Sequence, residues 1–122
     1  MNDQHSPTAN RVLDYYRLVD AGDIAGIVEL FAPDVEYSRP GYDPFVGRAA
    51  LEAFYRDQRR IRCGKHTVRS LVEGADAIAV QGEFTGTLRT GERVSLRFAD
   101  FFDVAPDGNF TRRNTYFYQP MV

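Results

Sequence analysis

Apolar residues recur at helical spacing in the first half of the chain and at alternate positions in the second half. The helical pattern predicts three helices, at about 7–21, 24–32 and 48–61. The first has a hydroxyl cap at Ser6 followed by Pro7 at the first helical position, which is a typical helix start. A short strand is predicted at 34–39, between the second and third helices.

The alternating pattern begins near residue 66 and is interrupted by three turn signals, Glu73-Gly74-Ala75-Asp76, Arg89-Thr90-Gly91-Glu92 and Pro106-Asp107-Gly108-Asn109. It predicts four antiparallel strands, at about 66–73, 76–89, 92–105 and 110–118. Helices that precede a meander of strands are typical of the α+β class. We therefore expect three N-terminal helices to lie on one face of a curved sheet.

One strand face carries a buried acid. In the strand from Val94 to Val104, the alternate positions are apolar except for Asp100. An unpartnered carboxylate is costly to bury, so such a group is usually neutralised, paired or used in function. A hydrogen-bonded structural role for Asp100 is the alternative, because unusual carboxylates mark functional sites only as a tendency.

The turns predict which side chains share the face with Asp100. With two-residue loops at all three turns, Asp100 pairs with Thr115 and Gln81, and His66 lies opposite Glu83. Directly opposed residues share a face. A concave, mostly apolar face with a few polar groups is typical of a small-molecule pocket. The expected members of this site are Tyr37, His66, Gln81, Glu83, Phe98, Asp100, Phe102, Arg113, Thr115 and Phe117.

The opposite face of the sheet is also apolar, and no predicted helix remains to cover it. An exposed apolar patch of this kind usually marks a partner surface, and a two-fold homodimer is the simplest partner. We therefore expect a homodimer formed through the outer sheet face. The residues assigned to this face are Ile78, Val80, Phe84, Ala99, Phe101, Tyr116 and Tyr118.

Composition narrows the function classes. The chain has 122 residues, which fits a single domain spanning 1–122, and its net charge of −2 argues against nucleic acid as a partner. The basic run from Arg56 to Lys65 is expected to be a solvated helix end. There is no membrane-span or signal-peptide pattern, so the expected location is the cytoplasm. One cysteine and two histidines predict no metal site, and without a phosphate-binding glycine loop no cofactor is expected.

These features resemble the ketosteroid-isomerase branch of the NTF2-like superfamily, which includes SnoaL-like proteins. The resemblance is carried by the segment from Tyr15 to Phe31 (YYRLVDAGDIAGIVELF) and covers nearly the whole chain. The other matching positions are Pro40, Gly47-Arg48, Phe54-Tyr55, Leu96 to Asp100 and Asp107-Gly108. It implies a cone-shaped α+β barrel of the NTF2-like (cystatin-like) type, open at one end and usually dimeric.

The resemblance also assigns roles. Tyr15 matches the tyrosine that donates to the substrate oxyanion in ketosteroid isomerases, and Asp100 matches their neutral aspartic acid. The position of the family's general base is occupied by Arg39, which stays charged and cannot accept a proton. Arg39 is therefore expected to bind an anionic or carbonyl oxygen of the substrate. His66 could replace the base, with Glu83 orienting its ring.

Several alternatives stay open at this point. Asp100 is an ionised base if Arg39 reaches it, and a protonated donor if Arg39 faces the substrate. Tyr15 could be a core residue with a satisfied hydroxyl. We expect a cofactor-independent isomerase, cyclase, dehydratase or hydrolase that acts on a small oxygenated organic molecule, with Tyr15, Asp100, His66 and Glu83 as catalytic residues. The alternatives are a non-catalytic small-ligand-binding module and a structural dimer.

Overall fold

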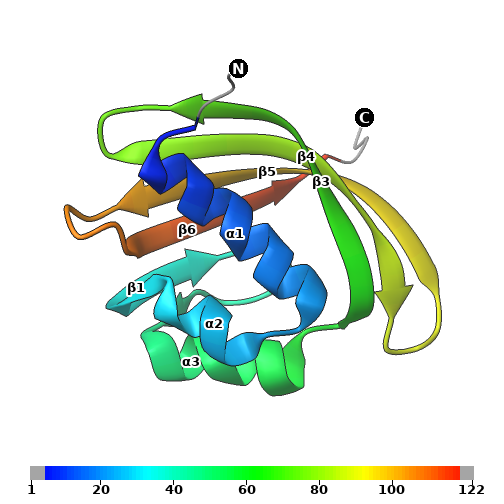
Figure 1. The fold of residues 1–122 in the computed structure, drawn as a ribbon. Helices are drawn as coiled ribbons and strands as arrows, with labels where there is room; N and C mark the ends of the chain where they lie inside the picture. Colours follow the sequence, from blue (N-terminus) through cyan, green and yellow to red (C-terminus); the bar gives the residue numbers. More distant parts are fainter. Residues whose placement is uncertain (1–4, 119–122) are drawn as a thin grey trace.

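A computed structural model describes residues 5–118, and one curved sheet organises them (Figure 1). The sheet is six-stranded and unclosed, in the order β2-β1-β6-β5-β4-β3. The helix α1 crosses its concave face, and α2 and α3 lie beside β1 (Figure 1). The predicted α+β class is confirmed. The elements are α1 (Pro7–Ala21), α2 (Ile24–Glu29), β1 (Phe31–Ser38), β2 (Phe45–Val46), α3 (Arg48–Ala53), the π-helical turn η1 (Phe54–Gln58), β3 (Ile61–Glu73), β4 (Ala77–Leu88), β5 (Arg93–Val104) and β6 (Phe110–Phe117).

The helix α1 forms as predicted because both of its ends are capped. The Ala9 N–H donates to the Ser6 hydroxyl over 3.0 Å. At the other end Gly22 has a φ of 73°, a left-handed conformation that glycine adopts without strain. The buried face of α1 presents two adjacent tyrosines, Tyr15 and Tyr16, to the sheet. The helix α1 therefore supplies the two tyrosine side chains that pack against the concave face of the sheet.

The last hairpin brings Asp100 beside polar residues of β6. Asp100 pairs with Thr115 and Phe102 pairs with Arg113, as predicted. The strand β6 also pairs in parallel with β1, which aligns Tyr37 with Arg113. This parallel pairing was not predicted, because it joins segments far apart in sequence. Together these pairings place polar side chains on the face of the sheet that α1 covers.

The predicted register of the second hairpin is wrong by one residue. Val80, not Gln81, lies opposite Asp100, and Gly82, not Glu83, lies opposite Phe98. The loop is longer than two residues: the Leu88 N–H donates to the Glu92 carbonyl, and Gly91 has a φ of 94°. A shift of one residue moves every side chain to the other face. Gln81 and Glu83 are consequently exposed on the outer face.

The first hairpin also differs from the prediction. Glu73 pairs with Ile78 next to the loop, and the register shifts between Val68 and Ser70. His66 therefore lies opposite Phe84, and the predicted pairing with Glu83 is wrong. His66 still reaches the inner face, because Phe84 itself is buried there.

Two helices are shorter than predicted. The second ends at Glu29, and Phe31 instead begins β1, where it pairs with Phe110. The third ends at Ala53 and continues as the π-helical turn η1, after which β3 begins at Ile61. In both places sheet pairing outweighs local helical spacing. The two-residue strand β2 lies in the predicted loop and pairs with β1.

The outer face is smaller than predicted. Ile78, Val80 and Phe84 are buried in the core, a consequence of the register shift. The aromatic residues that remain outside are Phe101, Tyr116 and Tyr118, with exposed fractions of 49%, 57% and 65%. No helix within residues 5–118 has the length and apolar character needed to cross a membrane.

Candidate active site

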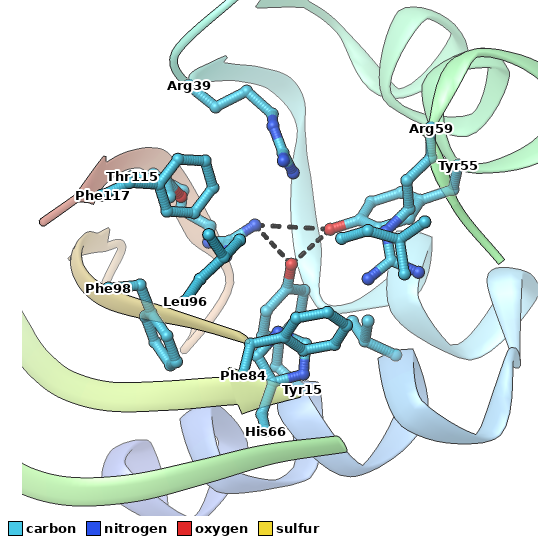
Figure 2. A pocket seen from close by; sticks show the side chains of 13 residues that line it. Tyr15, Arg39, Tyr55, Arg59, His66, Phe84, Leu96, Phe98, Thr115 and Phe117 are labelled. Atoms are coloured by element: carbon cyan, nitrogen blue, oxygen red, sulfur yellow. Dashed lines mark hydrogen bonds between the residues drawn. The ribbon is translucent and has the colours of Figure 1, made fainter. Parts of the chain in front are cut away.

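A small cavity of about 30 Å³ lies between α1, η1 and the concave face of the sheet (Figure 2). This volume has room for about two water molecules and is well below the roughly 300–1,000 Å³ of pockets that enclose a drug-sized ligand, so a larger ligand must extend toward the cavity mouth or displace lining side chains. One part of its wall is apolar and another carries hydroxyl, imidazole and guanidinium groups. The lining residues are Tyr15, Val19, Arg39, Tyr55, Arg59, Ile61, His66, Phe84, Leu96, Phe98, Arg113, Thr115 and Phe117.

Asp100 is fully buried beneath this cavity and does not line it. Its carboxylate accepts hydrogen bonds from the Tyr16 hydroxyl at 2.5 Å, from Arg113 Nη2 at 2.8 Å and from the Thr115 hydroxyl. Three donors surround this one carboxylate, and the hydrogen bond from the guanidinium is a charge-assisted one. The residue that pairs with it is Arg113, which is 4% exposed, and not Arg39. The structure thus places Asp100 in a buried ion pair with Arg113.

Tyr15 and Tyr55 form a pair of phenols at the cavity wall (Figure 2). Their hydroxyls are hydrogen-bonded to each other, and Arg113 Nη1 donates to both, to Tyr55 at 3.4 Å. Burial raises the pKa of both phenols above the usual value, although Arg113 opposes that shift. Both therefore stay protonated near neutral pH. One hydroxyl hydrogen bridges the two oxygens, so the other is available to a ligand.

Tyr15 and Asp100, to which the resemblance assigns roles at one substrate oxyanion, do not contact each other. The neighbouring residue, Tyr16, donates to the Asp100 carboxylate, and Tyr15 reaches the carboxylate only through Arg113. The structure therefore separates two groups that the sequence suggested would act on one oxygen. Tyr55, the second phenol, is among the positions that match the family but was not predicted as a site residue.

His66 lines the cavity and is oriented by Asp20. Its Nδ1 lies 2.6 Å from Asp20 Oδ1, and its backbone N–H donates to Asp20 Oδ2 over 2.9 Å. Burial lowers the pKa of His66, an effect that Asp20 partly offsets and that Arg113 and Arg59 reinforce. A neutral ring that donates from Nδ1 to a carboxylate carries an unprotonated Nε2, as a general base requires.

Asp20 could have been found from the sequence. It follows Tyr16 by four residues and therefore lies on the same face of α1. The predicted partner, Glu83, is exposed on the outer face, where Arg69 Nη2 donates to it over 3.1 Å. The structure therefore supplies His66 with a different carboxylate.

Two further arginines line the cavity near its mouth. Arg39 Nη1 donates to the Tyr37 hydroxyl over 3.2 Å, and its guanidinium lies 5.1 Å from the Phe54 ring centroid. Arg59 lies over the Tyr55 ring at 5.8 Å. The buried Nε atoms of Arg39, Arg59 and Arg113 have no hydrogen-bond partner among the described residues. Arg59 was expected to be solvated, and instead it is half-buried.

The remaining predicted residues occupy different positions. Phe98, Thr115 and Phe117 line the cavity. Tyr37 is buried behind it, with its hydroxyl 3.4 Å from that of Thr115. Phe102 is also buried and lies under the Arg113 guanidinium at 5.6 Å. Within residues 5–118, no cluster of three His, Cys, Asp or Glu side chains could hold a metal ion.

Comparison with solved structures defines the class of fold. An NTF2-like protein of unknown function from Burkholderia pseudomallei K96243 aligns with a TM-score of 0.84 and 20% identity, over 93% of this chain and 92% of that chain. The epoxide hydrolase/cyclase-like enzyme SalBIII, described in pyran ring formation in the polyether salinomycin, aligns with a TM-score of 0.81 and 23% identity, over 92% and 91% of the two chains. The fold is therefore NTF2-like.

Sequence comparison then defines the family. A SnoaL-like domain model matches residues 12–113, so the chain belongs to the SnoaL-like domain family. The curated epoxide hydrolase LasB of Streptomyces lasalocidi is 52% identical over 42 residues. That segment is 34% of this chain and 15% of LasB, so the chain matches only a small part of the LasB length. The predicted family and fold are both confirmed.

Proposed function

We propose that this protein is an enzyme of the epoxide hydrolase/cyclase type, which opens an epoxide with water or with a hydroxyl of the same substrate. The observation that carries the proposal is one cavity lined by an Asp20-oriented histidine and by a phenol pair held by Arg113. A base and a hydroxyl donor on the wall of one cavity suit proton transfer at both ends of an epoxide opening. The names of LasB and SalBIII support the same reaction class.

In this mechanism His66 Nε2 accepts the proton of the attacking hydroxyl as its oxygen forms the new C–O bond. The epoxide C–O bond breaks, and its electrons remain on the departing oxygen. The free O–H of the Tyr15–Tyr55 pair donates its proton to that oxygen, and the phenolate then recovers the proton held by His66 through water. Arg113 stabilises the transient phenolate charge, since its Nη1 already contacts both phenol oxygens.

Two predicted residues take supporting roles. Asp100 is a positioning residue, because it is fully buried and acts through Arg113, which it holds at 2.8 Å. Arg39 binds an oxygen of the substrate, because it reaches the cavity and its Nε is unpartnered. Arg39 occupies the position of the family's general base, and His66 on β3 supplies a base in its place.

The test is turnover of a panel of epoxides that carry a hydroxyl four or five atoms away, with cyclic ether and diol products followed by NMR. We expect His66→Gln and Tyr15→Phe each to reduce kcat about 100-fold or more, the range for loss of a general acid or base. His5→Gln is the matched control, because His5 is exposed and is not among the residues that line the cavity. Full activity in His66→Gln would refute the proposed base.

A second candidate function is non-catalytic binding of a small ligand. The observation that favours it is the raised pKa of Tyr15 and Tyr55, caused by burial, which makes both phenols weaker acids. This candidate predicts saturable binding that survives His66→Gln, together with no turnover of epoxides, enones or hydroxy-ketones.

We also propose that two copies pair through the outer sheet face. The support is the exposed cluster of Phe101, Tyr116 and Tyr118 on a face that none of the described helices covers. Exposed aromatic patches of this kind are typical of association surfaces.

A further inference from the structure

The cavity wall has an unbalanced positive charge. Three arginines line it, and only Arg113 has an acidic partner in the described residues. No carboxylate is among the lining residues. Arg39 directly follows β1 and Arg59 directly follows η1, yet both reach the same cavity (Figure 2).

These two cations are also held in place. The Arg39 guanidinium sits among Tyr42, Phe54 and Phe117, with ring centroids 5.1 to 5.7 Å away. The Arg59 backbone is fixed on both sides, since its N–H donates to the Phe54 carbonyl and its carbonyl accepts from Arg89 Nε over 2.6 Å. Buried guanidinium N–H groups are costly to leave unpaired, so an unpartnered Nε on each residue points to an acceptor outside the chain.

We infer that the cavity takes an anionic substrate whose carboxylate, or equally acidic enolate, is bound by Arg39 and Arg59. A guanidinium presents N–H donors in a planar fork that matches two oxygens sharing one negative charge. The inference rests on the proposed function in that it concerns the same cavity. It can be tested separately from the reaction, because binding is measured without turnover. The apolar side chains Leu96, Phe98 and Phe117 supply the surface for the rest of the molecule.

The binding test uses matched probes. 3-Phenylpropanoate and 3-phenylpropanamide have nearly the same shape and differ in charge, and the acidic enol dimedone represents the enolate source. We expect saturable calorimetric binding of an anion in the millimolar range, at least about tenfold tighter than the amide. Dimedone binding without phenylpropanoate binding would identify an enolate as the anion. No saturable binding of either anion up to about 10 mM, or equal affinity for the amide, would overturn the inference.

Arginine variants locate the anion. Arg39→Gln and Arg59→Gln should each weaken binding of the anion about tenfold and leave amide binding unchanged, as expected for loss of a charge-assisted hydrogen bond. Arg17→Gln is the control, because it removes the same charge from an exposed α1 residue that is paired with Asp14. Thermal unfolding of each variant checks the fold. Unchanged anion affinity in folded Arg39→Gln and Arg59→Gln would refute the assignment.

A second readout places the anion beside His66. The chain has two histidines, so the ring protons of His66 can be followed by NMR with His5 as an internal reference. Burial lowers the pKa of His66, and the charges of Arg113 and Arg59 lower it further. A bound anion should raise it, and the amide should not. Arginine-dependent anion binding without epoxide turnover would refute the proposed reaction alone, whereas equal turnover of neutral and anionic epoxides would refute this inference alone.

Discussion

Replacing Asp100 with asparagine should be among the most damaging single changes to this fold. The carboxylate is fully buried, accepts three side-chain hydrogen bonds and balances the charge of Arg113, which is 4% exposed. In Asp100→Asn the guanidinium stays charged and loses its counter-ion. Removing one partner of a buried ion pair typically costs about 3–5 kcal/mol of unfolding free energy. For a domain whose total stability is roughly 5–15 kcal/mol, this is a large fraction.

The partners of Asp100 provide graded comparisons. Tyr16→Phe and Thr115→Val each remove one donor to the carboxylate without removing charge. A hydrogen bond to a charged group contributes about 1.5–3 kcal/mol, so both variants should be less damaging than Asp100→Asn. Asp103→Asn is the matched control, because Asp103 is an exposed residue of the same strand, and it should change stability by less than about 0.5 kcal/mol.

The assay is urea unfolding followed by circular dichroism, with the free energy extrapolated at constant m. A double-mutant cycle isolates the pair: Asp100→Asn combined with Arg113→Met leaves no uncompensated charge, so it should be less destabilised than the sum of the single changes. A loss below about 1 kcal/mol in Asp100→Asn, or strict additivity in the cycle, would contradict the assignment of a buried ion pair.

Three further predictions follow, two on His66 and one on the outer sheet face. Since burial lowers the pKa of His66 in the free enzyme, the acidic limb of kcat/KM should lie below pH ~6.5, and Asp20→Asn, which removes the interactions that raise this pKa, should move the limb to still lower pH. A limb that moves upward in Asp20→Asn would count against the dyad. Because the pKa of His66 is lower in the folded state than in the unfolded state, its contribution to stability is fully present above pH ~6.5 and is lost as pH falls toward the folded-state pKa. Free energies of unfolding measured at several pH values should show this dependence, and the dependence should be weaker in His66→Gln. For the outer face, light scattering should show a dimer that Phe101→Glu converts to a monomer. Val46→Glu is the control and should leave the dimer intact, because Val46 is an exposed apolar residue on β2. A monomeric unmodified protein would refute the proposed dimer.

The structure explains why the strand register was only partly predictable. The last hairpin was predicted correctly, whereas in the second a longer loop with Gly91 in a left-handed conformation replaced the expected two-residue turn. Because side chains alternate between faces, that single residue decided that Glu83 lies outside and Phe84 inside. A turn sequence constrains the loop length without fixing it, so residue type alone could not settle the face.

The sequence by itself determined the α+β class, the capped helix α1 and the burial of Asp100, because caps and hydrophobic periodicity act over a few neighbouring residues. Only the tertiary structure decided the partners: Asp100 with Arg113 and Tyr16, His66 with Asp20, and Tyr15 with Tyr55. Adjacent tyrosines on one helix face are equivalent in a periodic pattern, and their roles diverge only when the helix is placed at a definite height and rotation over the sheet. That placement depends on the long-range pairing of β1 with β6, which local residue patterns do not encode.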